Sequence, residues 1–205
     1  MFIYLVRHLP TKFNLSGVYM GRSFDIPIAT SGVGGFRGRV GALFSQGVGE
    51  GVLVFSSPAL RCQQTAEVLK DVLGLAVETF VVEAFDETDY GEFEGLHPRQ
   101  IKARWSGLYH TWMNTPSQIT FPGGESFEQV QERSYQKLLE LLRECPEGIK
   151  TLFVITHVDV IKMLVSKVLS IPIDCKRSFC VDTGSFSLLE SIGEEIRVRY
   201  LNLRT

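Results

Sequence analysis

The chain has few cysteines, and their spacing excludes two classes of small protein. Cys62, Cys145, Cys175 and Cys180 are scattered without any Cys-x-x-Cys pair. In a chain of 205 residues this spacing predicts neither a disulfide framework nor a zinc site. We expect Cys62 to be a buried structural thiol.

The chain also lacks a strong net charge and a long apolar run. A formal net charge of −2 gives no electrostatic reason to expect nucleic acid or an anionic membrane as a partner. No apolar run approaches the roughly 20 residues needed to span a bilayer. The apolar stretch at residues 2–6 is interrupted by Arg7 and His8, so we do not expect a signal peptide and expect a cytoplasmic protein.

Short apolar runs alternate with segments of helical periodicity along the chain. Strands are predicted at residues 2–6, 52–55, 77–85 and 151–156, and helices at 30–44, 59–73, 98–113, 126–145 and 159–169. Residues 179–189 and 196–203 are predicted to pair as closing strands. Strands that alternate with helices of this length predict an α/β fold, a three-layer αβα sandwich with a mainly parallel sheet. We expect one domain over residues 1–205, with an excursion over the edge of the sheet at about 92–124.

The predicted helix at 30–44 is rich in glycine, with Gly32, Gly34, Gly35, Gly38 and Gly41. Glycine costs about 1 kcal/mol relative to alanine at a helix position. This helix is therefore expected to be held by packing, and its glycines to allow a close approach to the sheet.

Chemically active side chains follow the predicted buried strands at the point where each strand ends. Because the carboxyl ends of parallel strands lie at one edge of a sheet, we expect two imidazoles and two guanidiniums to converge there. A carboxylate that follows the third strand can join them. These groups are Arg7, His8, Arg61, Glu87 and His157.

Such a set of groups suits phosphoryl transfer. Two arginine forks match phosphate oxygens, and a neutral imidazole can attack phosphorus to form a covalent intermediate. A carboxylic acid can protonate the departing oxygen and later activate water. A metal centre of His8, His157, Asp159 and Glu87 is the competing hypothesis, but the two arginines would repel a divalent cation.

The chain resembles the histidine phosphatase superfamily, the phosphoglycerate-mutase-like group, over nearly its whole length. Each matching block is short, and their order makes the resemblance specific. The blocks are Leu-Val-Arg7-His8-x-x-Thr11-x-x-Asn14, Gly21-Arg22-x-x-Asp25-Ile-Pro27, Ser56-Ser57-Pro58-x-x-Arg61-x-x-Gln64-Thr65-Ala66, Asp86-Glu87-x-x-Tyr90-Gly91-x-Phe93-Glu94-Gly95, Pro122-Gly123-Gly124-Glu125-Ser126 and Val154-Ile155-Thr156-His157.

The resemblance implies a phosphomonoester hydrolase that acts on a small phosphorylated metabolite through a phosphohistidine. His8 would be the phosphorylated nucleophile, and Glu87 the acid and then the base. The residues that would grip the phosphoryl group are Arg7, Arg61 and His157. The residues at the phosphate and in the substrate pocket would be Asn14, Thr11 and Gly21. No metal or organic cofactor would be required. The partner would be a small phosphate ester, and the chain could also form a homodimer.

Two positions depart from the family's pattern. Leu9 stands where the family usually has glycine, and a bulky side chain there is expected to alter the turn or the pocket. Val158-Asp159 stands where the family usually has small residues. A carboxylate near a phosphate site would repel the anion unless it binds a base, a hydroxyl group or a substrate cation.

Three alternatives stay open beside hydrolysis of a general phosphate ester. A phosphoglycerate mutase shares the same core, although family mutases carry a longer, arginine-rich excursion than the one here, with its Arg99, Lys102 and Arg104. The loop at 17–21 also resembles that of α-ribazole phosphatases. A phosphate-binding or interaction domain without turnover is the non-enzymatic alternative.

Overall fold

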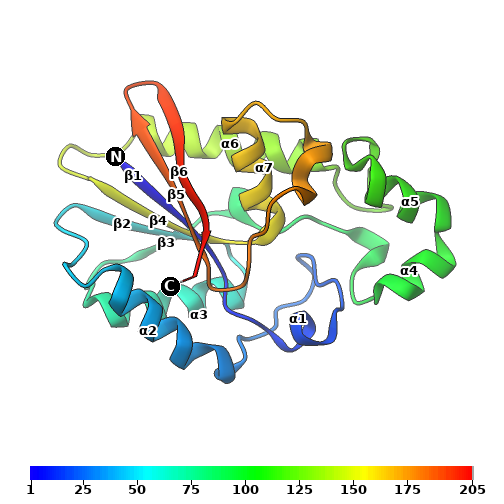
Figure 1. The fold of residues 1–205 in the computed structure, drawn as a ribbon, viewed down its shortest axis with the longest axis horizontal. Coiled ribbons are helices and arrows are strands. Elements are labelled where there is room, and N and C mark those ends of the chain that lie inside the picture. Colours follow the sequence, from blue (N-terminus) through cyan, green and yellow to red (C-terminus); the bar gives the residue numbers. More distant parts are fainter. Residues whose placement is uncertain (205) are drawn as a thin grey trace.

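The computed structural model describes residues 1–204, which form a six-stranded sheet with the strand order β3-β2-β4-β1-β5-β6 (Figure 1). The strands are β1 (Phe2–Arg7), β2 (Val52–Ser56), β3 (Thr79–Val81), β4 (Thr151–Thr156), β5 (Phe186–Ile192) and β6 (Glu195–Leu203). Strands β3, β2, β4 and β1 are mutually parallel, whereas β5 and β6 join as an antiparallel pair beside β1. The predicted mainly parallel α/β sheet is confirmed.

Helices cover both faces of this sheet (Figure 1). One face carries α2 (Val33–Leu43) and α3 (Leu60–Leu73), and the other carries α6 (Phe127–Arg143) and α7 (Val158–Val168). Along β4, Leu152 and Val154 pack into the core under α6 and α7, while Phe153 and Ile155 pack under α2 and α3. Because successive strand residues point to opposite faces, a continuous apolar run is buried on both sides. The three-layer sandwich is as predicted.

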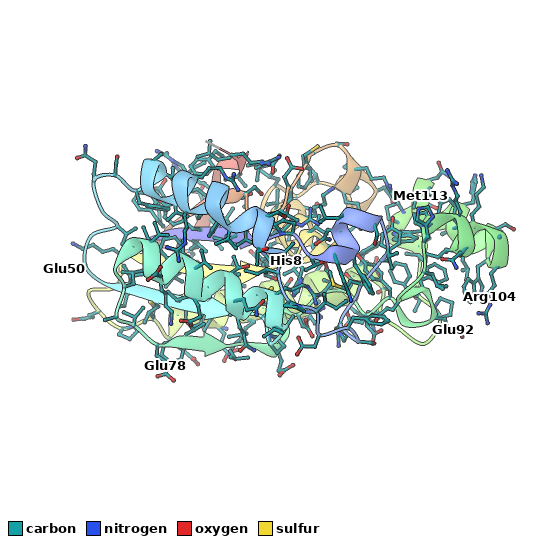
Figure 2. The ribbon with its side chains drawn as sticks, turned by 90° about the horizontal axis from the view of Figure 1, so that it is seen from below. His8, Glu50, Glu78, Glu92, Arg104 and Met113 are labelled. Carbon is teal, nitrogen blue, oxygen red and sulfur yellow. The ribbon has the colours of Figure 1, made fainter. Side chains whose placement is uncertain are left out.

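The excursion forms one end of the molecule, beyond the sheet (Figure 1). It carries α4 (Pro98–Arg104) and α5 (Ser106–Asn114), and Arg104 and Met113 mark this end in Figure 2 while His8 lies near the middle. Trp112 is buried, with its ring 4.5 Å from Tyr19 and 5.2 Å from Phe121. Trp112 is therefore a packing residue of the excursion. Across residues 1–204, no helix has the length and apolar character that a bilayer crossing needs.

Two predicted elements in this part of the chain are shorter than expected. The helix predicted at 98–113 breaks at Trp105, whose φ of −133° and ψ of 60° are not helical. The break directs Trp105 onto Phe93, with ring centroids 5.0 Å apart. The strand predicted at 77–85 is ordered as a strand only over Thr79–Val81, because the chain then turns inward and buries Phe85 in the core.

Two further segments differ from the sequence prediction near the ends of β1. Residues 12–16, where no helix is predicted, form a short helix, α1 (Lys12–Ser16), whose N-terminus is closed by a capping box of Thr11 and Asn14. The strand predicted at 179–189 starts only at Phe186, because Ser185 closes a turn onto the carbonyl of Asp182.

The glycines of α2 face open space rather than the sheet. A Cβ atom at Gly34, Gly38 or Gly41 would meet no atom within 4 Å. The expectation of a close approach to the sheet is therefore wrong for these three glycines, whereas a Cβ atom at Gly32, just before α2, would lie 2.7 Å from the ring of Pro10. The helix is instead held by Phe36 and Val40, which are fully buried.

Replacing Gly38 with alanine is therefore expected to stabilise the protein. The new methyl group has room, and alanine reduces the backbone entropy of the unfolded chain, so the free energy of unfolding should rise by about 0.5–1 kcal/mol. Urea denaturation of the wild type and Gly38→Ala measures this difference.

Gly91→Ala is the matched control. Its φ is +52°, and a Cβ atom there would lie 2.0 Å from the carbonyl oxygen of Pro122, so this variant should lose stability. If Gly38→Ala were no more stable than the wild type, backbone entropy would not be what limits α2.

Candidate active site

The carboxyl ends of the central parallel strands border a cavity of about 240 Å³. Six of the eight predicted site residues line it, namely Arg7, His8, Asn14, Gly21, Arg61 and Glu87. The register pairs Arg7 of β1 with Thr156 of β4, so the residues after both strands emerge at one edge. Thr11 and His157 do not line the cavity and lie behind it.

His8 is buried, and one of its ring nitrogens is occupied by the backbone. Nδ1 lies 2.6 Å from the carbonyl oxygen of Leu9. Because a carbonyl only accepts hydrogen bonds, Nδ1 carries the proton and Nε2 keeps its lone pair. Burial, with help from His157 and Arg61, holds the pKa of His8 well below its usual value. The imidazole is therefore neutral and can act as a nucleophile.

Arg61 is buried and is held by three groups outside its own helix, one of which is the carbonyl of Phe24, to which it donates at 3.1 Å. Its guanidinium donates to the carbonyl of Gly21 at 2.8 Å and lies 3.2 Å from Nδ1 of His157. A guanidinium only donates, so Nδ1 of His157 accepts and Nε2 carries the proton. Nε2 donates to Ser57 Oγ at 2.7 Å, and Ser57 donates to Asp86 at 3.1 Å.

His157 thus uses both ring nitrogens inside the protein. Burial and the neighbouring Arg61 hold the pKa of His157 well below its usual value, which keeps the ring neutral. In this geometry His157 positions Arg61. Direct contact of His157 with a phosphoryl group stays a prediction.

Arg7 makes one side-chain hydrogen bond among the described residues, from Nη1 to the carbonyl of Val181 at 2.6 Å. A guanidinium has five N–H donors, so most of those of Arg7 are left for a ligand. Arg7 and Arg61 therefore bring two planar forks to one cavity, an arrangement that suits an oxyanion.

Glu87 is buried at the wall of the cavity, where the backbone N–H of Thr88 donates to its Oε1 at 3.0 Å. Burial first, and then the charge of Asp159, raise the pKa of Glu87 to about 7. A carboxyl group with that pKa can donate a proton and take one back near neutral pH.

The loop that carries Glu87 is held by a group of three charges, of which sequence analysis missed Arg133. Arg133 of α6 donates to the carbonyls of Asp86 and Glu87 at 2.8 and 3.1 Å and pairs with Glu125 at 3.1 Å. Arg22 also pairs with Glu125. Arg133 carried no signal in the sequence, because it looks like an ordinary charged residue of an exposed helix face.

Asn14 and Gly21 also line the cavity, and Thr11 lies behind Asn14. The backbone N–H and the hydroxyl of Thr11 both donate to Oδ1 of Asn14 at 3.0 Å, which leaves the amide N–H groups of Asn14 for a ligand. Thr11 is buried, so it positions Asn14 and does not itself line the cavity. Gly21 has a φ of +58°, and a Cβ atom there would lie 1.7 Å from Glu94.

Leu9 does not alter the pocket, which corrects the expectation from the sequence. Its side chain is fully buried in the core with Phe36 and Val40, on the face covered by α2. Its N–H donates to Thr65 Oγ1 at 2.9 Å. The bulky side chain fills the core because it points away from the cavity.

Asp159 is bound by two groups of its own chain. Oδ1 lies 2.7 Å from Nζ of Lys176, and Oδ2 accepts from the hydroxyl of Tyr90 at 2.5 Å. Burial alone would raise the pKa of Asp159, but Lys176 and these hydrogen bonds hold it below its usual value. Its charge is therefore already paired, so the expected repulsion of a phosphate is largely offset. Lys176 lies far along the chain, and no spacing pointed to it.

All four cysteines are free, and burial raises the pKa of the fully buried Cys62, as expected for a structural thiol.

Within the described part of the chain, no three His, Cys, Asp or Glu side chains are placed to hold a metal ion. The donors that converge here are those of an anion site.

Comparison with known proteins points in the same direction. The adenosylcobalamin/alpha-ribazole phosphatase of Escherichia coli is 25% identical over 204 residues, which is 100% of this chain and 97% of the relative. The 2,3-bisphosphoglycerate-dependent phosphoglycerate mutase of Sinorhizobium fredii is 30% identical over 164 residues, 78% and 76% of the two chains. The structure of a mycobacterial glucosyl-3-phosphoglycerate phosphatase is similar in fold, with a TM-score of 0.84, 23% identity and 98% of both chains covered.

The family assignment rests on a match that spans almost the whole chain. The model of the histidine phosphatase superfamily (branch 1) matches residues 3–204. The blocks that carried the resemblance, from Arg7-His8 to His157, all lie inside this range. The chain belongs to the histidine phosphatase superfamily.

Proposed function

We propose that this chain is a phosphomonoester hydrolase in which His8 forms a phosphohistidine. The observation that carries the proposal is the state of His8, a neutral imidazole whose Nδ1–H is fixed on the carbonyl of Leu9. His8, whose Nε2 keeps its lone pair, lines the same cavity as the two guanidiniums and the carboxyl group of Glu87, which has a pKa of about 7.

In the first half of the reaction, Nε2 of His8 attacks phosphorus and the bond from phosphorus to the alcohol oxygen breaks. Arg7 and Arg61 bind the oxygens of the phosphoryl group and neutralise its charge. Glu87 in its protonated form gives a proton to the departing oxygen. This step needs positioning and charge neutralisation above all, and the two guanidiniums supply both.

In the second half, Glu87 is a carboxylate and takes a proton from water as the water oxygen attacks phosphorus. The bond from phosphorus to Nε2 breaks, phosphate forms, and His8 returns to its neutral state. Glu87 ends protonated and ready for the next ester. The Leu9 carbonyl stabilises the ring while it carries the phosphoryl group, because its Nδ1–H stays hydrogen bonded throughout.

We also propose that the reaction needs no metal or organic cofactor, because two guanidiniums provide the positive charge. The substrate is a small phosphorylated metabolite. Four free thiols fit a reducing compartment, which supports a cytoplasmic enzyme.

Hydrolysis is favoured over mutase chemistry by the excursion. Its basic residues Arg99, Lys102 and Arg104 do not line the cavity. Arg104 instead lies over the ring of Trp105, with 4.4 Å to the centroid. A mutase must shield its phosphohistidine from water, and these three residues contribute nothing to the wall of the cavity around His8. α-Ribazole phosphate is one substrate to test, since the E. coli relative is named for it.

Replacing His8 tests the nucleophile. With p-nitrophenyl phosphate, His8→Ala should lose at least about 10³-fold in kcat, because the covalent route is removed. Wild-type activity should be unchanged by EDTA. Mass spectrometry of enzyme quenched at alkaline pH should show a phosphorylated His8 peptide in the wild type only.

His110→Ala is the control, because His110 lies exposed on α5. Activity that survives His8→Ala would overturn the nucleophile assignment, and loss of activity with EDTA would restore the metal hypothesis. Interconversion of the phosphoglycerates without release of phosphate would identify a mutase. Bound phosphate with no turnover of any ester would identify a binding domain.

Replacing Glu87 tests the acid and base. For an alkyl phosphate, Glu87→Gln should lower kcat by about 10²–10⁴-fold, because the alkoxide then leaves unprotonated. With p-nitrophenyl phosphate, phosphorylation of His8 should still occur in Glu87→Gln, since p-nitrophenolate leaves without a proton. The phosphohistidine should then accumulate, because its hydrolysis needs Glu87 as the base. A burst of p-nitrophenol followed by slow turnover measures this.

The pH profile separates this role from a structural one. Glu87 must be protonated for the first step, so kcat/KM for the alkyl phosphate should fall as the pH rises above about 7. This fall in kcat/KM at high pH should be absent in Glu87→Gln. It should be kept in Glu92→Gln, which changes an exposed position of the excursion. A fall that persists in Glu87→Gln would contradict the assignment.

A further inference from the structure

A second hollow of about 170 Å³ adjoins the cavity that holds His8. The two share Tyr19, Tyr90 and Val158 as a common wall. Its remaining lining residues are Trp112, Asp159, Lys162, Lys176 and Arg177. When a phosphate ester is bound, its alcohol part has to extend out of the phosphate cavity. The adjoining hollow is one space into which it can extend.

We propose that this hollow binds a second anionic group, a carboxylate, on the alcohol part of the substrate. Lys162 and Arg177 are the residues that would recognise it. The inference rests on the proposed phosphatase function, which it narrows to phosphate esters of hydroxy acids.

The charges around the hollow leave two cations without a carboxylate partner, although Lys162 lies over the ring of Phe179, 5.6 Å from its centroid. Three basic side chains face a single carboxylate, and both oxygens of that carboxylate are already engaged by Lys176 and Tyr90. Lys162 and Arg177 have no carboxylate within 4 Å among residues 1–204. The lining is therefore positive overall, and an anionic group would complete it.

The two cations stand on different elements and converge on one space. Lys162 follows Val158 by one turn of α7, and Val158 belongs to the wall shared with the phosphate cavity. Arg177 donates to the carbonyl of Trp112 in α5 at 3.5 Å, so it is tied to the excursion. A carboxylate between them would meet the ammonium from one element and the planar fork of arginine from another.

Aromatic rings make the rest of the wall and strengthen this attraction. Trp112 lies 4.5 Å from Tyr19 and 5.7 Å from Tyr90, measured between ring centroids. Apolar walls lower the local dielectric constant, which strengthens the attraction between the half-buried Lys162 and a carboxylate, whereas the exposed Arg177 contributes from the rim of the hollow. A hollow of about 170 Å³ also suits a short carboxylic acid rather than a large ring system.

The test compares two esters that differ only in the proposed group. 3-Phosphoglycerate carries a carboxylate where glycerol 3-phosphate carries a hydroxymethyl group. The wild type should release phosphate from 3-phosphoglycerate with a kcat/KM at least about tenfold higher. Lys162→Gln and Arg177→Gln should each reduce this ratio about tenfold, which corresponds to ~1.4 kcal/mol, mainly through a higher KM for 3-phosphoglycerate.

Two further variants control the result. Lys167→Gln removes a positive charge from the same helix at an exposed position outside the hollow, and it should leave the ratio unchanged. Lys162→Arg keeps a cation and should retain most of the preference. Equal losses for both esters in Lys162→Gln and Arg177→Gln, or no preference in the wild type, would overturn the subsite.

p-Nitrophenyl phosphate distinguishes failure of the subsite from failure of the proposed function. If the wild type hydrolyses it through His8 but shows no preference for the carboxylate, the phosphatase stands and the subsite is wrong. If no phosphate ester is hydrolysed, the proposed function is wrong and the subsite fails with it.

Discussion

The structure depends on gathering two guanidiniums and two imidazoles at one buried edge of a sheet. Uncompensated charge is expensive to bury, so each group needs a partner or must stay neutral. Both histidines stay neutral, because burial and the nearby arginines hold their pKa values well below the usual one. Arg7 and Arg61 donate to the backbone carbonyls of Val181 and Gly21, which satisfies part of each fork. The donors that remain make the site specific for an anion.

The residues around the cavity keep these groups in place. His157 accepts from Arg61 on one side and donates to Ser57 on the other, so the imidazole links α3 to the turn after β2. Arg133 binds the backbone on either side of Glu87 and connects it to the long helix α6. A carboxyl group whose pKa depends on burial must be held in its buried position, and these contacts do so. Catalysis by positioning therefore extends well behind the cavity wall.

Sequence analysis could predict the layers of the fold and the charged and titratable side chains of the cavity, because both follow from local patterns. Apolar runs predict buried strands, and the rule that parallel strands end at one edge brings Arg7, His8, Arg61 and Glu87 together. It could not predict which way Leu9 points, since one residue after a strand can face either the core or the cavity. It also missed the pairing of Asp159 with Lys176, because the two are joined only by the packing of α7 against the turn that follows it. The break at Trp105 likewise depends on a tertiary contact, with Phe93.

Asp159 links the acid of the proposed reaction to the second hollow. Its charge is one of the causes that raise the pKa of Glu87, while its two oxygens bind Lys176 and Tyr90. A carboxylate bound by Lys162 and Arg177 would bring another negative charge to the same neighbourhood. That charge would further disfavour the ionised form of Glu87, and so favour the protonated acid that the first step requires. Recognition of an anionic leaving group and preparation of the acid would then be one electrostatic event.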